Sequence, residues 1–133
     1  MLNRLTDTLD FHAQALTLRS ERQRLIASNI ANADTPGYLA RDINFAQALQ
    51  QATASQTTRT LTTSRSGHIV GPAAGVAKPE LLYATQSQTN LDRNTVDMDR
   101  ERANFADNSV RYEATLRFIN GNVRTLMSAI TGQ

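Results

Sequence analysis

Apolar residues recur every three or four positions over the first thirty residues of the chain. The positions reached by these steps are 2, 5, 9, 12, 16, 19, 23, 26 and 30, and six of them are apolar. A second apolar row lies beside the first at heptad spacing and consists of Phe11, Leu18 and Leu25. This spacing predicts one long amphipathic helix whose apolar face is wide enough to contact more than one neighbour. The apolar members of the first row are Leu2, Leu5, Leu9, Leu16, Ile26 and Ile30.

A second and more regular pattern closes the chain, from about Val96 to Ile130. Its seam alternates steps of four and three, and Ser109 is its polar member. Such a seam predicts a helix that lies along a partner helix over roughly 50 Å. Gly121 lies off the seam and costs about 1 kcal/mol relative to Ala, so we expect helical continuity to be weakest there. The apolar seam residues are Phe105, Tyr112, Leu116, Ile119, Val123, Leu126 and Ile130.

The middle of the chain is polar and rich in turn-forming residues. Residues 41–44 read as an extended piece that leads into a short helix capped near Asn44, with Phe45 and Leu49 on one helix face. Residues 52–67 are mostly Thr, Ser and Gln and predict loop or disorder. Ile69-Val70 and Leu81-Leu82-Tyr83 are candidates for short strands. We therefore expect three parts: an N-terminal helix over 1–33, an irregular excursion over 34–92 and a C-terminal helix over 93–133.

The first helical pattern stops at a segment that begins at Asn29 and ends at Tyr38. Pro36 fixes its own φ and disfavours the α region for the residue before it, so the helix must end upstream. Thr35-Pro36-Gly37-Tyr38 has Pro and Gly at the central positions of a type II turn. Asn29 and Asn32 suit the last turn of a helix because their side chains can bond to nearby backbone groups.

The string over residues 25–38 (LIASNIANADTPGY) resembles the N-terminal signature of the bacterial flagellar axial proteins, the rod and hook family. The motif positions are Asn29, Asn32, Thr35, Pro36, Gly37 and Tyr38. Residues 41–45 (RDINF) and 94–99 (NTVDMD) are similar to the short proximal-rod member of that family. The resemblance covers both ends of the chain well and the middle poorly.

The resemblance implies a mainly α fold in which the N- and C-terminal helices pair as an antiparallel coiled-coil hairpin, with an irregular, partly extended or β middle. It implies a structural subunit of the proximal rod that self-associates and stacks with other rod proteins into a hollow drive shaft. The implied partners also include the adaptor to the membrane ring and the type III export gate. Phe45 and Leu49 fit the Phe-x-x-x-hydrophobic element that docks on that gate in rod and hook proteins.

Composition changes this picture little. The net charge is +2, with 14 basic and 12 acidic residues and no basic run, so nucleic-acid binding is poorly supported. The chain has no Cys, which excludes disulfides and thiolate chemistry. It shows no membrane-spanning run and no cleavable secretory signal, so the residues alone predict a cytosolic protein. The resemblance implies instead a periplasmic rod subunit of the basal body, exported without a cleavable signal peptide.

Candidate chemistry is sparse. His12 and His68 lie far apart, and we find no phosphate loop, nucleophile elbow or zinc motif. Reading a calcium loop from Asp92 places Val96, Asp97 and Ala103 where a ligand, a glycine and a glutamate are needed, so helix capping accounts better for these acidic residues. We therefore expect no enzyme activity, cofactor, metal or small-molecule substrate. The alternative function is a cytosolic helical regulator or type III secretion chaperone that binds a partner through the same seams.

Overall fold

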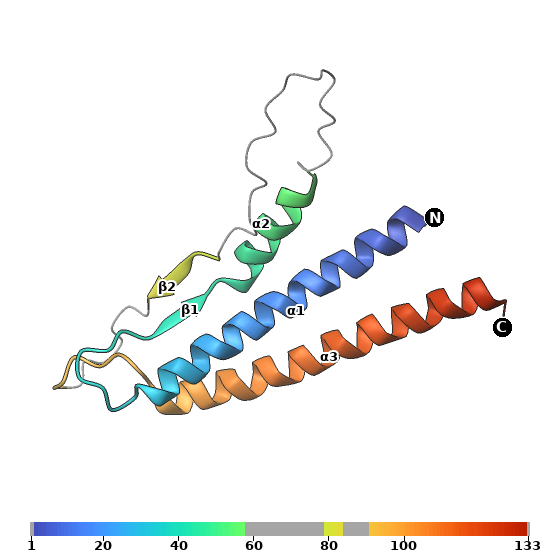
Figure 1. Cartoon of the computed structure of the whole chain (residues 1–133). Coiled ribbons are helices and arrows are strands. Elements are labelled where there is room, and N and C mark those ends of the chain that lie inside the picture. The colour runs from blue at the N-terminus through green and yellow to red at the C-terminus, as the bar shows by residue number, and fades with distance from the viewer. Residues whose placement is uncertain (1, 58–78, 84–90, 133) are drawn as a thin grey trace, which may run out of the picture.

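The structure is a computed structural model that describes residues 2–57, 79–83 and 91–132. Figure 1 shows two long helices side by side. Alongside them lies a shorter part, residues 41–57 and 81–83, which we call the arm. The elements in chain order are α1 (Leu2–Ala31), β1 (Arg41–Ile43), α2 (Phe45–Thr57), β2 (Leu81–Tyr83) and α3 (Met98–Thr131). The chain is mainly helical, as the two apolar patterns predict.

The helices α1 and α3 run in opposite directions, so both ends of the chain lie at the same end of the hairpin (Figure 1). We call that the open end, and the end where α1 stops and α3 begins the closed end. The helices lie closest at the closed end and diverge toward the open end (Figure 1). Buried residues follow the same gradient: in α1 they lie between Ala15 and Asn29, and in α3 between Glu101 and Thr115. The predicted pairing of the terminal helices is confirmed.

The wide apolar face of α1 contacts two different neighbours. Ile26, which is 1% exposed, lies one turn after Gln23, whose side-chain oxygen accepts a hydrogen bond from Asn108 of α3. Leu18 and Leu25, from the second apolar row, form a small core with Ile43 of β1 and Ala48 of α2. The arm is therefore anchored on one flank of the hairpin by apolar contacts, as the width of the predicted face indicates.

The two short strands form an antiparallel pair in which Asp42 lies opposite Leu82. This confirms the extended segment before Asn44 and the strand expected at 81–83. Asn44 begins α2, since its side-chain oxygen accepts a hydrogen bond from the backbone N–H of Gln47 at 3.2 Å. Ile69-Val70, the other strand candidate, lies outside the described residues.

One local expectation needs correction. The helix α2 continues to Thr57, so the segment predicted as loop from residue 52 is helical over its first six positions. Its start docks on α1, and this tertiary contact favours the helix where composition favours a loop. The helix α3 runs through Gly121 without a break, because an exposed helical glycine lowers stability only modestly. Within the described residues, neither long helix is apolar enough to span a bilayer.

Candidate assembly site: the closed end and the faces of the hairpin

The stop segment forms the predicted turn. The backbone N–H of Tyr38 donates to the carbonyl of Thr35 at 3.3 Å, and Gly37 has φ of +71°. A positive φ at the third position defines a type II turn and favours glycine there. Asn32 donates from its side-chain amide to the carbonyl of Ser28 at 2.8 Å, which satisfies one of the last carbonyls of α1.

Asn29 is the centre of the closed end and is 1% exposed. Its amide pairs with both backbone groups of Arg41: Nδ2 donates to the carbonyl at 2.8 Å, and Oδ1 accepts from the N–H at 3.0 Å. Nδ2 also donates to Oε2 of Glu101 at 3.2 Å, and Oδ1 accepts from the Tyr38 hydroxyl at 3.3 Å. One side chain thus joins α1, β1 and α3. The sequence indicated bonding to nearby backbone and did not reveal this buried, long-range role.

Asn94 closes the other side of the turn. Its amide nitrogen lies within 2.9 Å of three carbonyl oxygens, those of Asn32, Ala33 and Thr35. Its own Oδ1 accepts from the backbone N–H of Val96 at 2.8 Å. These carbonyls belong to the turn just after α1, and a residue about sixty positions later supplies their donor. The signal for this role was present in the sequence only as the family resemblance of residues 94–99.

The backbone beside this clamp is paired as well. The N–H of Gly37 donates to the carbonyl of Asp92 at 2.8 Å, and the N–H of Thr95 donates to the carbonyl of Tyr38 at 3.1 Å. The hydroxyl of Thr95 accepts from the N–H of Ala40 at 2.9 Å. The motif at the end of α1 and the segment that leads into α3 therefore form one hydrogen-bonded unit, and this unit sets the direction in which the chain leaves the hairpin.

The line of α3 that is most buried against α1 is polar. Glu101, Asn108 and Thr115 follow one another at heptad spacing, and Asn108 is fully buried. The amide nitrogen of Asn108 donates to the carbonyl of Arg19 at 2.9 Å and to Oε1 of Gln23 at 2.6 Å. Buried polar residues at such positions fix the register of paired helices at some cost in stability. The predicted apolar seam therefore lies beside the contact line and not on it.

The structure leaves much of the apolar seam of α3 accessible. Phe105 and Val123 are 41% and 43% exposed, and Ile130 is 78% exposed. The other seam residues are partly buried: Tyr112, Leu116, Ile119 and Leu126. On α1, Ile26 is buried and Leu9, Leu16 and Ile30 are partly buried. Leu2 and Leu5 lie in α1, and their side chains are outside the described part.

The partly exposed residues of the two helices meet along one side of the hairpin. A groove of about 370 Å³ is lined by Ala27, Ile30, Ala31, Arg102 and Phe105. Further toward the open end, Leu16 and Tyr112 line a second groove of about 320 Å³ together with Thr17, Ser20 and Glu21. We call the apolar and aromatic residues that line these two grooves the apolar stripe: Leu16, Ala27, Ile30, Ala31, Phe105 and Tyr112.

Phe45 and Leu49 lie on the opposite flank, partly buried against the small core under α2. The guanidinium of Arg19 lies 4.3 Å from the centre of the Phe45 ring, in cation–π contact. Burial, followed by the nearby charge of Arg111, lowers the pKa of Arg19. Arg22 and Asp42 fasten β1 to α1 through two hydrogen bonds of 2.9 Å, which raise the pKa of Arg22.

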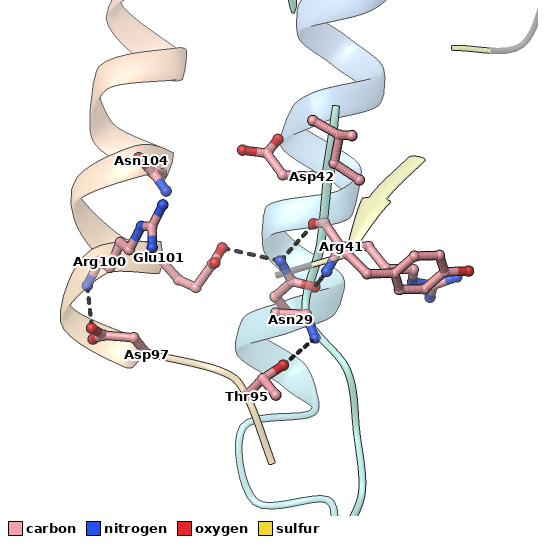
Figure 2. Close-up of a pocket in the computed structure, with 11 residues that line it drawn as sticks. Asn29, Arg41, Asp42, Thr95, Asp97, Arg100, Glu101 and Asn104 are labelled. Carbon is pink, nitrogen blue, oxygen red and sulfur yellow. Dashed lines mark hydrogen bonds between the residues drawn. The ribbon is translucent and has the colours of Figure 1, made fainter. Parts of the chain in front are cut away.

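A polar cleft of about 280 Å³ opens between the hairpin and the strands. Figure 2 shows Glu101 reaching from α3 toward Asn29, with Arg100 and Asn104 of the same helix also lining the cleft. Burial raises the pKa of Glu101, and the hydrogen bond from Asn29 opposes this effect. Asp97 caps α3 by accepting from the N–H groups of Asp99 and Arg100. This confirms the capping interpretation, and no metal-binding cluster occurs within the described residues.

The fold and its closed end define a class of protein: a helical hairpin whose first helix ends in an asparagine-rich segment and a Pro-Gly turn. The family model described as "Flagella basal body rod protein" matches residues 9–38, which cover most of α1 and the turn at its end. The matched region contains Asn29, Pro36 and Gly37, the residues that build the closed end.

Full-length relatives narrow the class. The flagellar basal body rod protein FlgB of Proteus mirabilis strain HI4320 is 46% identical over 134 residues, 98% of each chain. FlgB of Salmonella typhimurium is 46% identical over 138 residues, 99% of each chain. FlgB of Escherichia coli K12 is 44% identical over 134 residues, with 98% of this chain and 97% of the relative covered. The chain therefore belongs to the FlgB family of flagellar basal body rod proteins.

The chain is thus a structural component of the proximal rod in the flagellar basal body, and it is not an enzyme. Membership of the rod means that it associates with other rod proteins. These findings favour the rod subunit over the cytosolic regulator or secretion chaperone.

Proposed function

We propose that the chain builds the rod by lateral contact through the apolar stripe and the rest of the α3 seam, which bury against copies of the chain and against other rod proteins. The observation that carries this proposal is the offset between the seam and the hairpin contact line. Glu101, Asn108 and Thr115 face α1, while Phe105, Val123 and Ile130 keep a large exposed area beside it. An apolar surface of this kind on a structural subunit is suited to a protein interface.

Substitution of exposed seam residues tests this proposal. Phe105→Ser and Val123→Ser should leave the hairpin folded, because both side chains are already about two-fifths exposed. Each should weaken rod association about three- to eightfold, because full burial of such a side chain contributes about 1.5–3 kcal/mol and about two-fifths of it remains to be buried. The measurement is the amount of the chain in purified basal bodies, together with swimming in soft agar.

Val110→Ser is the matched control. Val110 is 70% exposed on the same helix and lies off the seam. Normal basal bodies with the two seam variants, or equal loss with all three variants, would contradict assembly through the seam.

We also propose that the adaptor of the membrane ring binds the assembled hairpin at the periplasmic base of the rod.

We further propose that Phe45 and Leu49 contact the export gate. Support for the gate contact comes from the family pattern Phe-x-x-x-hydrophobic and its position after the first helix. In the folded chain both side chains pack against the small core between α1 and α2 and are partly buried. The gate would therefore have to bind them before α2 docks on α1, so recognition would precede folding.

Export of Phe45→Ala can be compared with export of Ile43→Ala. Both substitutions remove apolar contacts from the same small core, and each should lower stability by about 2–4 kcal/mol. Only Phe45→Ala removes a residue of the proposed recognition element. We expect Phe45→Ala to accumulate in the cytoplasm while Ile43→Ala is exported, measured by immunoblotting of cell fractions. Equal export of the two variants would count against a gate contact at Phe45.

A further inference from the structure

The polar cleft beside the strands contains a carboxylate that the described fold leaves without a cation. Glu101 is 8% exposed, and Asn29 donates to one of its oxygens, Oε2. Within the described residues Glu101 forms no ion pair. A buried carboxylate with a single amide donor is poorly compensated for the loss of water.

The other two carboxylates that line the cleft are already compensated. Asp42 accepts hydrogen bonds from Nε and Nη2 of Arg22, and it also accepts one from the N–H of Ile43. Asp97 accepts from two backbone N–H groups at the start of α3. Glu101 is therefore the buried carboxylate of this cleft, whereas Asp97 is exposed to water and Asp42 is paired with Arg22.

The positive charges near the cleft do not meet this need. Arg22 is taken up by Asp42, while Arg41 of β1 and Arg100 of α3 line the cleft without an ion pair to Glu101. Burial raises the pKa of Glu101, and the charges of Arg100 and Arg22 offset this effect only in part. Arg41 and Arg100 would repel a cation that enters the cleft. The carboxylates of Glu101, Asp42 and Asp97 would attract it.

The apolar part of the cleft lining favours a cation that carries an apolar stem. Leu82 and Tyr83 of β2 line it and are 46% and 60% exposed. Lysine and arginine side chains place an aliphatic stem on apolar surface and extend a charged head beyond it. An aromatic ring beside the charge adds a cation–π contact. A small free ion would use none of this surface.

We propose that the cleft receives a basic side chain, lysine or arginine, from a neighbouring subunit of the rod, with Glu101 as the residue that binds its charge. This rests on the proposed lateral assembly and names a second contact, on a different side of the hairpin from the apolar stripe. Within the described residues no cation pairs with this carboxylate, and association supplies one. The site thus favours the assembled state over the free chain.

A small-molecule probe tests the site in the isolated full chain. The probe is N-acetyl-arginine amide, added to isotopically labelled protein, and the readout is the side-chain carboxyl resonance of Glu101 through a pH titration. A bound cation stabilises the charged form, so the probe should lower the pKa of Glu101 by about 1. Resonances of Asn29 and Tyr83 should shift with it.

Two variants localise the response. Glu101→Gln keeps an oxygen that can accept from Asn29 and should abolish the shifts at Asn29 and Tyr83 without loss of thermal stability. Asp99→Asn removes a carboxylate from the same turn outside the cleft lining and should respond like wild type.

An unchanged pKa of Glu101 in the presence of the probe would overturn the proposal. So would a stronger response to N-acetyl-glutamate amide, which would make the cleft an anion site built on Arg41 and Arg100. The Phe105→Ser variant should retain the probe response. Failure of assembly through the stripe is therefore distinguishable from failure of the cleft.

Discussion

At the scale of single residues, two asparagines hold the closed end together. Asn29 is buried and bonds to β1, α3 and the turn, whereas Asn32 is partly buried and bonds to Ser28 of its own helix and to Thr35 of the turn. Both occupy the same sequence motif and both end an amphipathic pattern. Their different burial follows from tertiary contacts with residues 12 and 72 positions away. No local pattern encodes these contacts, which explains why the sequence indicated two similar roles.

Replacing each asparagine by alanine separates these roles. Asn29→Ala leaves the N–H of Arg41 and the carboxylate of Glu101 without a partner, and an orphaned buried polar group costs about 1–3 kcal/mol. Asn32→Ala removes a partly exposed bond and should cost about 1 kcal/mol or less. Chemical denaturation of both variants measures the difference. Equal losses would show that Asn29 is not the centre of the closed end.

At the scale of elements, the periodic patterns were sufficient to locate the two long helices and insufficient to predict which residues pack between them. The apolar steps located α1 and α3 and the second row at Leu18 and Leu25, because burial of an amphipathic face leaves a direct record in the sequence. They did not locate the contact line of α3, because Asn108 is polar and asparagine is usually exposed, whereas here it is fully buried. The end of α2 at Thr57 was also missed, because tertiary docking outweighs the polar composition of its last turn and a half.

The start of α3 offers a clean test at this scale. Asp97 accepts from two N–H groups of the first turn, and loss of such a cap costs about 1 kcal/mol. We expect Asp97→Ala to lower the free energy of unfolding by that amount, while Asp97→Asn retains most of the stability because asparagine caps equally well. Asp99→Ala is the control for loss of a nearby charge. A cost for Asp97→Ala no greater than that of the control would exclude the cap as a stabilising feature.

At the scale of the whole molecule, order is concentrated at the closed end. Hydrogen bonds from Asn29 and Asn94 join the two helices there, and the buried residues of α1 and α3 lie within the adjoining half of the hairpin. Toward the open end the helices diverge (Figure 1), and Val123 and Ile130 are exposed. The sequence predicted a hairpin and gave no indication of this gradient, because the apolar steps of both helices continue to the open end.

Amide hydrogen exchange should reveal the gradient directly. In the isolated chain we expect slow exchange over residues 15–29 and 101–115 and fast exchange over 6–14 and 116–131, because local opening is easiest where few apolar contacts are made. Incorporation into the rod should slow exchange in the second set. Uniform protection along both helices of the free chain would be incompatible with the gradient.

The common location of the two termini has a practical consequence for work on living cells. A fluorescent reporter fused to either end of the chain would occupy the open end of the hairpin, next to the exposed part of the seam (Figure 1). Such a bulky appendage would obstruct neighbours in the shaft whichever terminus carried it, so moving the fusion from one end to the other would not restore swimming. A small dye attached to an exposed position in the arm, such as Gln47, would avoid that crowded region.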